Sequence, residues 1–256
     1  MRLLVSGRET APPPTNPCGY PYPPISDIIG WWDASCPDTL DLGPLGINYP
    51  VRGIADSIGN GNDMVKFNAS YPFYNTTLFN TTYPGVLFTA TDLGCLYCPN
   101  FPLGTGNTLT AWYVGTFSGP ASGGFGRTLS YNMGASPGGF EVMSAFSNNT
   151  VTFYRGNFPA GLISTTGAIY PAGHRFIFTV SALGIMTIYI DGVASATVMV
   201  AGNWISNGTL LFGGEAGASS GGFWTGLAGE WGISTAFADA SGVAALDAYL
   251  ATKWGL

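Results

Sequence analysis

Residues 174–192, with the sequence HRFIFTVSALGIMTIYIDG, carry the clearest structural signal in the chain. Apolar residues alternate with other residues in both halves, around positions such as Phe176 and Ile188, and the Ala-Leu-Gly of residues 182–184 separates the halves. The segment closes with Asp191-Gly192, a dipeptide suited to a turn with positive φ. The pattern predicts two antiparallel strands joined by a short turn.

The same alternation occurs on both sides of this hairpin. Further strands are predicted at residues 108–117, 150–154, 210–212 and 227–233, with glycine-rich links such as 122–126 and 218–222 between them. Many short strands with turns and almost no helix predict an all-β protein built as a two-sheet antiparallel sandwich.

One helix is predicted, at about residues 240–252 near the C-terminus. Val243, Leu246, Tyr249 and Leu250 recur at helical spacing. Asp239 or Ser241 is expected to cap its start.

Residues 1–28 differ from the rest because they are rich in proline. Seven prolines lie within a short stretch, at positions 12, 13, 14, 17, 21, 23 and 24. Proline fixes φ and lacks a backbone donor, so this arm is expected to be extended. It is either a spacer or an arm that docks on a neighbouring subunit, with residues 3–5 as an added strand. The folded domain is then residues 29–256.

Charge is scarce over all 256 residues. Lys and Arg number 8 and Asp and Glu number 14, which gives a net charge of −6, and charged residues make up 9% of the chain. A nucleic-acid partner is not expected, because such binding needs a basic surface. No apolar run approaches the length of a membrane span, so membrane insertion is not expected either.

The N-terminal residues do not show the apolar run of a secretory signal. The expectation is that the protein is exported without such a signal or leaves the producing cell by lysis, inside a particle.

Several segments, in order, resemble a known family. They are residues 31–35 (WWDAS), 56–63 (DSIGNGND), 83–88 (YPGVLF), 183–192 (LGIMTIYIDG), 226–231 (GLAGEW) and 247–256 (DAYLATKWGL). Their order and spacing resemble the laminin G-like, concanavalin A-like lectin and glucanase jelly rolls found in phage virion proteins and bacterial surface proteins. The resemblance covers residues 29–256, and its most specific piece is the Tyr-Leu-x-x-Lys-Trp-Gly-Leu that ends at Leu256. It implies a jelly roll that serves as a binding or packing module.

Catalysis is not expected. The resemblance implies that glycoside hydrolases of this architecture carry Glu-x-Asp-x(-x)-Glu on one strand, which places two carboxylates in one cleft. None of the four glutamates, Glu9, Glu141, Glu215 and Glu230, has an acidic residue within four positions. Glu230 is expected to be a solvated or hydrogen-bonded surface group. His174 is expected at a strand end on the surface, because no Ser or Cys lies at a recognisable spacing from it.

Two kinds of binding site are conceivable from the residue types. Oxygen donors gather in one glycine-broken loop, as calcium would require, at Asp56, Asn60, Asn62 and Asp63. Ordinary turn chemistry explains the same residues and is favoured. Aromatic residues beside Asn- or Gly-rich loops are candidate platforms for a sugar ring, at Trp204, Trp224, Tyr131 and Tyr154. Trp31, Trp231 and Trp254 lie within the family-like segments and are expected in the core.

The four cysteines, Cys18, Cys36, Cys95 and Cys98, leave three readings open. They are two disulfides with three alternative connectivities, a tetrahedral zinc site, or small buried thiols.

The preferred hypothesis is a non-enzymatic structural or adhesion protein at the surface of a phage particle. It would be a capsid decoration, spike or tail-associated protein, a homo-oligomer whose arm contacts other virion proteins and whose jelly roll contacts a host glycan. Calcium is the one cofactor considered. The alternative is an extracellular or cell-surface bacterial carbohydrate-binding module or glycoside hydrolase.

Overall fold

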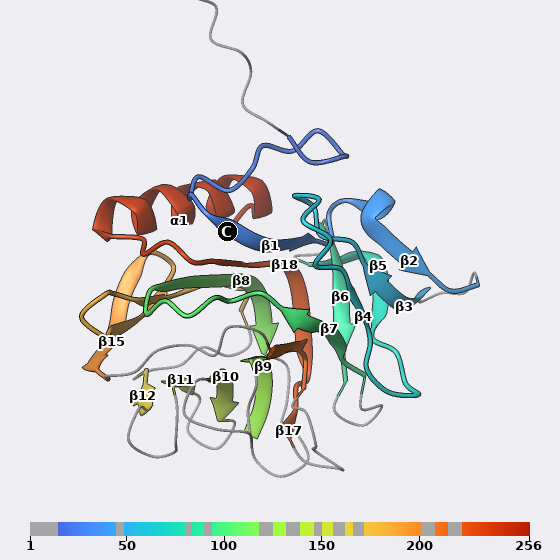
Figure 1. Ribbon diagram of the computed structural model, residues 1–256. Helices are drawn as coiled ribbons and strands as arrows, with labels where there is room; N and C mark the ends of the chain where they lie inside the picture. The colour runs from blue at the N-terminus through green and yellow to red at the C-terminus, as the bar shows by residue number, and fades with distance from the viewer. Residues whose placement is uncertain are drawn as a thin grey trace, which may run out of the picture.

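The computed structural model describes residues 15–44, 49–79, 83–89, 94–117, 125–131, 139–145, 150–155, 162–165, 172–200, 208–214 and 222–256. Within these ranges the protein is all-β, with 18 strands and one α-helix near the C-terminus (Figure 1). The strands pair antiparallel, except that β17 runs parallel to β9. The predicted all-β class is therefore confirmed.

The strand pairings fall into two groups. The first strand group has the order β15–β14–β13–β8–β18; β18 then pairs with both β1 and β6, and β6 pairs with β5. Its members are β1 (Ile28–Asp33), β5 (Phe73–Phe79), β6 (Tyr83–Phe88), β8 (Leu109–Phe117), β13 (His174–Val180), β14 (Ile185–Ile190), β15 (Val193–Met199) and β18 (Gly226–Ser234).

The second strand group has the order β12–β11–β10–β9–β16–β7–β4–β3–β2, with β17 beside β9. Its members are β2 (Leu40–Leu42), β3 (Tyr49–Ile54), β4 (Met64–Lys66), β7 (Leu96–Phe101), β9 (Phe125–Tyr131), β10 (Phe140–Ala145), β11 (Thr150–Arg155), β12 (Leu162–Ser164), β16 (Gly208–Phe212) and β17 (Gly222–Phe223). One turn of 3-10 helix, Pro37–Thr39, precedes β2. Because β3 also pairs with β5, the two groups join into one continuous network.

The main core lies between the two groups and is largely aromatic. Tyr113 of β8 lies 6.3 Å from Phe212 of β16, and Phe178 of β13 lies 5.4 Å from Phe153 of β11, measured between ring centroids. Such edge-to-face pairs add packing energy to the burial of a large apolar area.

The hairpin of residues 174–192 forms as predicted, from β13 and β14. The turn that follows it joins β14 to β15 and has Asp191 and Gly192 at φ 49° and 77°. Phe176 and Phe178 enter the main core, but Ile177 is also fully buried, on the opposite face of the sheet. Both faces of β13 are covered, which simple alternation does not predict.

The second face is covered by helix α1 (Ala240–Trp254). Asp239 caps its start by accepting a hydrogen bond from the Gly242 amide, and Gly255 ends it at φ 63°, as a left-handed C-terminal residue commonly does. The buried side chains of α1 pack on Trp31, Trp112 and Ile177 of the first strand group. In Figure 1, α1 lies outside β1, β18 and β8, on the side away from β9 to β12.

The N-terminal segment, here residues 15–27, does not project from the domain as an arm. A disulfide joins Cys18 to Cys36, Ser234 donates a hydrogen bond to the carbonyl of Ser26, and the ring of Tyr22 lies 5.5 Å from that of Trp31. The expectation of an extended arm up to residue 28 is wrong for this segment, because these contacts hold it on its own domain. Residues 1–14, including the predicted strand at 3–5, lie outside the described residues.

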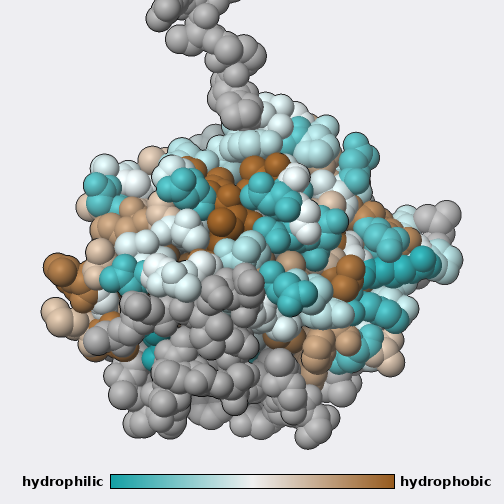
Figure 2. Space-filling view, in the orientation of Figure 1, coloured by the Kyte–Doolittle hydropathy of each residue, from teal (hydrophilic) through white to brown (hydrophobic). Residues whose placement is uncertain are grey.

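Large apolar side chains are exposed at one edge of the first strand group. Leu183, Val193 and Met199, around β14 and β15, are 77%, 69% and 70% exposed. Figure 2 shows hydrophobic atoms at the left edge of the molecule, where Figure 1 places β15.

Candidate functional site

A glutamate, Glu230, lies fully buried on β18 among three tryptophans. One oxygen, Oε1, accepts hydrogen bonds from the indole nitrogens of Trp31 at 2.9 Å and Trp112 at 3.4 Å. The other, Oε2, accepts one from the indole of Trp254 at 3.1 Å. An indole N–H only donates, so these three contacts favour the ionised carboxylate. The expectation of a surface Glu230 is wrong, because α1 covers the face of β18 that alternation assigns to solvent.

Lys253 of α1 neutralises part of this buried charge. Its ammonium lies 2.7 Å from Oε2 of Glu230 and 2.6 Å from Oδ2 of Asp33, at the end of β1. We call Asp33, Glu230 and Lys253 the ion cluster. The two carboxylate side chains are fully buried, and that of Lys253 is 7% exposed. The cluster therefore ties α1 to two neighbouring strands.

The pKa values of the ion cluster follow from burial and mutual attraction. Burial raises the pKa of Glu230, and Lys253 opposes that rise. Burial acts to lower the pKa of Lys253, but Glu230 and Asp33 outweigh it and raise that pKa above its usual value. Lys253 is thus held as the charged ammonium.

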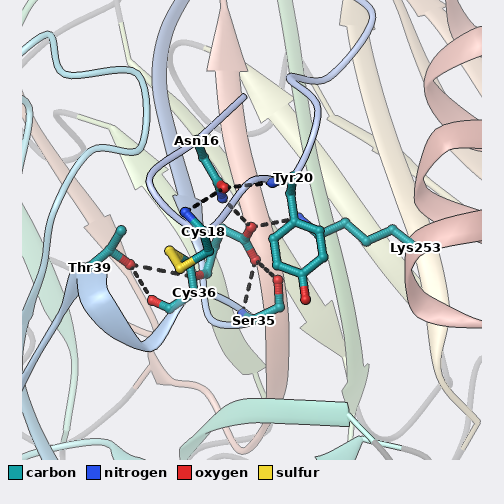
Figure 3. The surroundings of a disulfide bond; sticks show 8 residues. Asn16, Cys18, Tyr20, Ser35, Cys36, Thr39 and Lys253 are labelled. Carbon is teal, nitrogen blue, oxygen red and sulfur yellow. Dashed lines mark hydrogen bonds and ion pairs between the residues drawn. A yellow bond between two sulfur atoms is a disulfide. The ribbon is translucent and has the colours of Figure 1, made fainter. Parts of the chain in front are cut away.

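Asp33 also anchors the N-terminal segment. Figure 3 shows the surroundings of the disulfide, with the Asp33 partners Asn16, Ser35 and Lys253 labelled. Its Oδ1 accepts hydrogen bonds from the amide and hydroxyl of Ser35. Its Oδ2 accepts one from the side-chain amide of buried Asn16 at 3.0 Å. The side-chain oxygen Oδ1 of Asn16 in turn accepts hydrogen bonds from the backbone amides of Cys18 and Tyr20. The segment is thereby fixed above the ion cluster.

A pocket of about 560 Å³ opens between the N-terminal segment and α1. We call it the tyrosine pocket; its lining residues are Tyr20, Pro21, Ala248, Tyr249, Thr252 and Lys253. Tyr20 is 37% exposed, and Lys253 lies 4.9 Å from the centre of its ring. Tyr249 bonds inward, toward Oε2 of Glu230. The pocket therefore offers aromatic and apolar surface above a buried charged floor.

The carboxylates of the ion cluster are not arranged as a pair of catalytic acids. Asp33 and Glu230 both contact the same ammonium, so neither is a free base facing the pocket. Most glycoside hydrolases cleave the glycosidic bond with two carboxyl groups that flank it. The ion cluster does not offer that geometry, because its acids lie beneath the lining residues.

Two of the four predicted aromatic platforms lie in the core. Trp224 and Tyr131 are both fully buried, and their rings pack against Phe88 and Phe140 respectively. The prediction that they are exposed to a sugar is wrong, because a neighbouring glycine-rich loop does not determine where a side chain points. Trp204 and the side chain of Tyr154 lie outside the described residues. The predicted core tryptophans Trp31, Trp231 and Trp254 are fully buried, as expected.

The predicted calcium loop is occupied by turn hydrogen bonds. Asp56 accepts from the amides of Trp31, Ile58 and Asn60. Asp63 accepts from the amide of Asp56, and the Asn62 side chain donates to the carbonyl of Ile29. These bonds match the favoured turn interpretation. In the described parts of the chain, no three His, Cys, Asp or Glu side chains gather in a metal-binding group.

The structure combines two of the three interpretations of the cysteines, a disulfide and buried thiols. Cys18 and Cys36 form a disulfide, whereas Cys95 and Cys98 are free, buried thiols. Burial raises the pKa of Cys95 to about 12 and that of Cys98 to about 11. Both thiols are therefore protonated and unreactive at neutral pH. A four-cysteine zinc site and a second disulfide are both wrong.

His174 and Glu141, which the sequence analysis also considered, both have partners within the domain. His174 begins β13, as expected of a strand-end residue, and its Nδ1 lies 2.7 Å from Asp191. Glu141 is buried on β10 and forms an ion pair with Arg127 of β9.

Sequence reasoning did not identify the ion cluster or the tyrosine pocket. The signal lies in the C-terminal motif, where Tyr249 and Lys253 are four residues apart and so share one helix face. Asp33 directly follows Trp31 and Trp32 in another family-like segment. Nothing in the spacing pairs these segments with one another.

No family model matches the chain, and no curated protein sequence matches it. Among the helices of the described residues, none has the length and apolar character to cross a membrane.

Solved structures share the fold at low sequence identity. Domain 4 of AbnA, an extracellular GH43 arabinanase from Geobacillus stearothermophilus solved with arabinotriose, is 12% identical, with a TM-score of 0.62 over 86% of this chain and 98% of that domain. Trypanosoma rangeli sialidase is 13% identical, with a TM-score of 0.57 over 94% of this chain and 35% of its own. A botulinum neurotoxin type C structure is 14% identical, with a TM-score of 0.57 over 83% of this chain and 52% of its own. The chain thus spans about a third of the sialidase and half of the toxin structure. At these identities the comparisons identify the fold, that of β-sandwich domains.

Proposed function

We propose that this chain is a non-enzymatic binding protein whose jelly-roll sandwich is displayed on the surface of a virus particle and contacts a glycan. The observation that carries the binding role is the tyrosine pocket. It presents an exposed tyrosine and apolar surface to solvent, while the nearby carboxylates are paired with Lys253 beneath it. Sugar rings stack their apolar faces on such aromatic side chains.

The fold neighbours support a glycan as the ligand. The arabinanase domain was solved with arabinotriose, and Trypanosoma rangeli sialidase was solved with sialic acid. Cell entry of botulinum neurotoxin type C depends on interaction with two ganglioside molecules. These ligands belong to those proteins, and the fold alone does not transfer them. They set the class of ligand to be tested first.

The surface supports a place in an assembly. Only 9% of the residues are charged, and Leu183, Val193 and Met199 are exposed together near β15. A surface of this kind suits packing against sister subunits in a symmetric oligomer. In this proposal, the β15 edge and residues 1–14 make the contacts with other virion proteins.

Binding is tested with the full chain on a glycan array. We expect retention of a defined set of glycans, and loss of that binding in Tyr20→Ala. The matched control is Tyr71→Ala, because Tyr71 also packs on a lysine, Lys66, but lies outside the pocket lining. If no glycan is retained, or if both variants lose binding equally, the pocket is not the glycan site.

The particle setting needs a separate measurement. We expect the polypeptide in purified particles by mass spectrometry, at a copy number that reflects the particle's symmetry. Its absence from particles would exclude this setting.

A second candidate is a carbohydrate-binding module of an extracellular polysaccharide-degrading system. The match to nearly the whole of an arabinanase domain favours it. It predicts the polypeptide in culture medium rather than in particles. A fall in polysaccharide viscosity on incubation with the chain would show that it is itself a hydrolase, against the non-enzymatic role.

A further inference from the structure

The donors of Lys253, the one cation that lines the tyrosine pocket, are fully used inside the protein. A lysine ammonium has three N–H donors. Its acceptors are Asp33 at 2.6 Å, Glu230 at 2.7 Å and the Tyr249 hydroxyl at 3.2 Å. No donor of Lys253 remains for a carboxylate on a ligand.

The charge beneath the pocket is negative. The ion cluster has two carboxylates and one ammonium, a net charge of −1. Midway along α1, Asp247 shares the single guanidinium of Arg175 with Asp191, and His174 also lies beside Asp191. The whole chain has a net charge of −6. An anionic ligand in the pocket would meet like charge, which costs affinity when the site is desolvated.

A cationic ligand finds no free carboxylate in the lining, because Asp33 and Glu230 are buried and already paired with Lys253. The remaining polar groups are neutral. The hydroxyls of Tyr20 and Thr252 each donate and accept hydrogen bonds, and Pro21 and Ala248 add apolar surface. This combination suits a ring with one apolar face and uncharged hydroxyls.

We infer that the tyrosine pocket selects a neutral sugar ring and discriminates against sialylated and other acidic glycans. The inference rests on the proposed glycan-binding function and specifies its ligand class. It separates this chain from fold neighbours whose structures involve sialic acid or gangliosides.

The test uses an array that carries each neutral glycan beside its sialylated derivative, probed with the full chain. We expect the neutral member of a bound pair to be preferred by at least about tenfold at low salt, with the preference reduced at high salt, where charge is screened.

A gain-of-function variant sharpens the test. Ala248→Lys adds an unpaired ammonium on an exposed position of α1 that lines the pocket. We expect binding of the sialylated glycans to increase, by up to about fivefold for one exposed ion pair. Ala244→Lys, on the same helix but outside the pocket lining, is the matched control and should leave the ratio unchanged.

The outcomes separate the two proposals. Equal or tighter binding of sialylated glycans that depends on Tyr20 overturns the inference but retains glycan binding. Absence of binding to every glycan overturns both. A preference for neutral glycans that survives Tyr20→Ala places the selective site elsewhere and overturns the inference.

Discussion

Replacing Lys253 by methionine tests whether the ion cluster holds α1 on the domain. The change keeps most of the side-chain length but removes the charge that both buried carboxylates contact, at 2.6 and 2.7 Å. Removing one partner of a buried ion pair costs about 3–5 kcal/mol, because the remaining charge is left uncompensated. For a domain of this size that corresponds to a fall in Tm of about 6–20 °C.

The free energy of unfolding is measured by urea titration, with tryptophan fluorescence as the signal, since Trp31, Trp112 and Trp254 surround Glu230. Lys66→Met is the matched control. It removes the chain's other lysine, whose ammonium donates a hydrogen bond to the hydroxyl of Tyr71 outside the ion cluster. Even exposed ion pairs contribute only about 0–1 kcal/mol, so the loss of this contact should have a small effect.

The pH dependence of the variant gives a second readout. Without Lys253, the carboxylates repel each other and proton uptake by the folded state relieves the repulsion. The folded state then binds more protons than the unfolded state, so the lost stability should return as the pH falls from about 8 to about 5. A Lys253→Met variant that resembles Lys66→Met in both midpoint and pH response would refute the role of the cluster.

Three further predictions concern the disulfide, the thiols and the intact cluster. Cys18→Ser with Cys36→Ser should lower the free energy of unfolding by roughly 3 kcal/mol, since the disulfide closes a loop with a separation of 18 residues; an unchanged urea midpoint would contradict this. A thiol reagent should detect almost no free thiol in the native protein, two thiols after unfolding, and four after unfolding with reduction. The native thiols are protected because Cys95 and Cys98 are buried, which raises their pKa values to about 12 and about 11. Four thiols in the unfolded protein without reduction would exclude the disulfide. Raising the pH above 10.5, the ordinary pKa of lysine, should lower the free energy of unfolding of the wild type. The reason is that the raised pKa keeps Lys253 protonated in the folded state but not in the unfolded state. The Lys253→Met variant should lack this loss of stability at alkaline pH.

Six of the strands, β8, β11, β13, β14, β16 and β18, and the helix could be predicted because their signals are local. The other described strands are not predicted by the sequence pattern. The alternation at residues 174–192, its Asp-Gly turn, and the spacing and cap of α1 all reside within a few neighbouring residues. Each element contains enough information to specify its own conformation, and tertiary packing agrees with it.

The errors come from side chains whose environment is made by distant segments. Alternation on β18 assigns Glu230 to the face opposite Trp231, but it contains no indication that α1 will cover that face. The glycine-rich surroundings of Trp224 describe the backbone and not the direction of its ring. The cysteine spacing permits several pairings, and only the docking of the N-terminal segment brings Cys18 to Cys36.

The large sequence separation between the residues of the ion cluster also affects how the protein folds during synthesis. Asp33 and Lys253 are 220 residues apart in sequence, and Glu230 precedes its cation by 23. A nascent chain that includes residue 230 but not residue 253 has both acids and no ammonium to accompany them into the interior. We therefore expect the domain to close only after nearly all of this sequence has been synthesised, and a product interrupted within α1 to be more sensitive to proteolysis than the full chain.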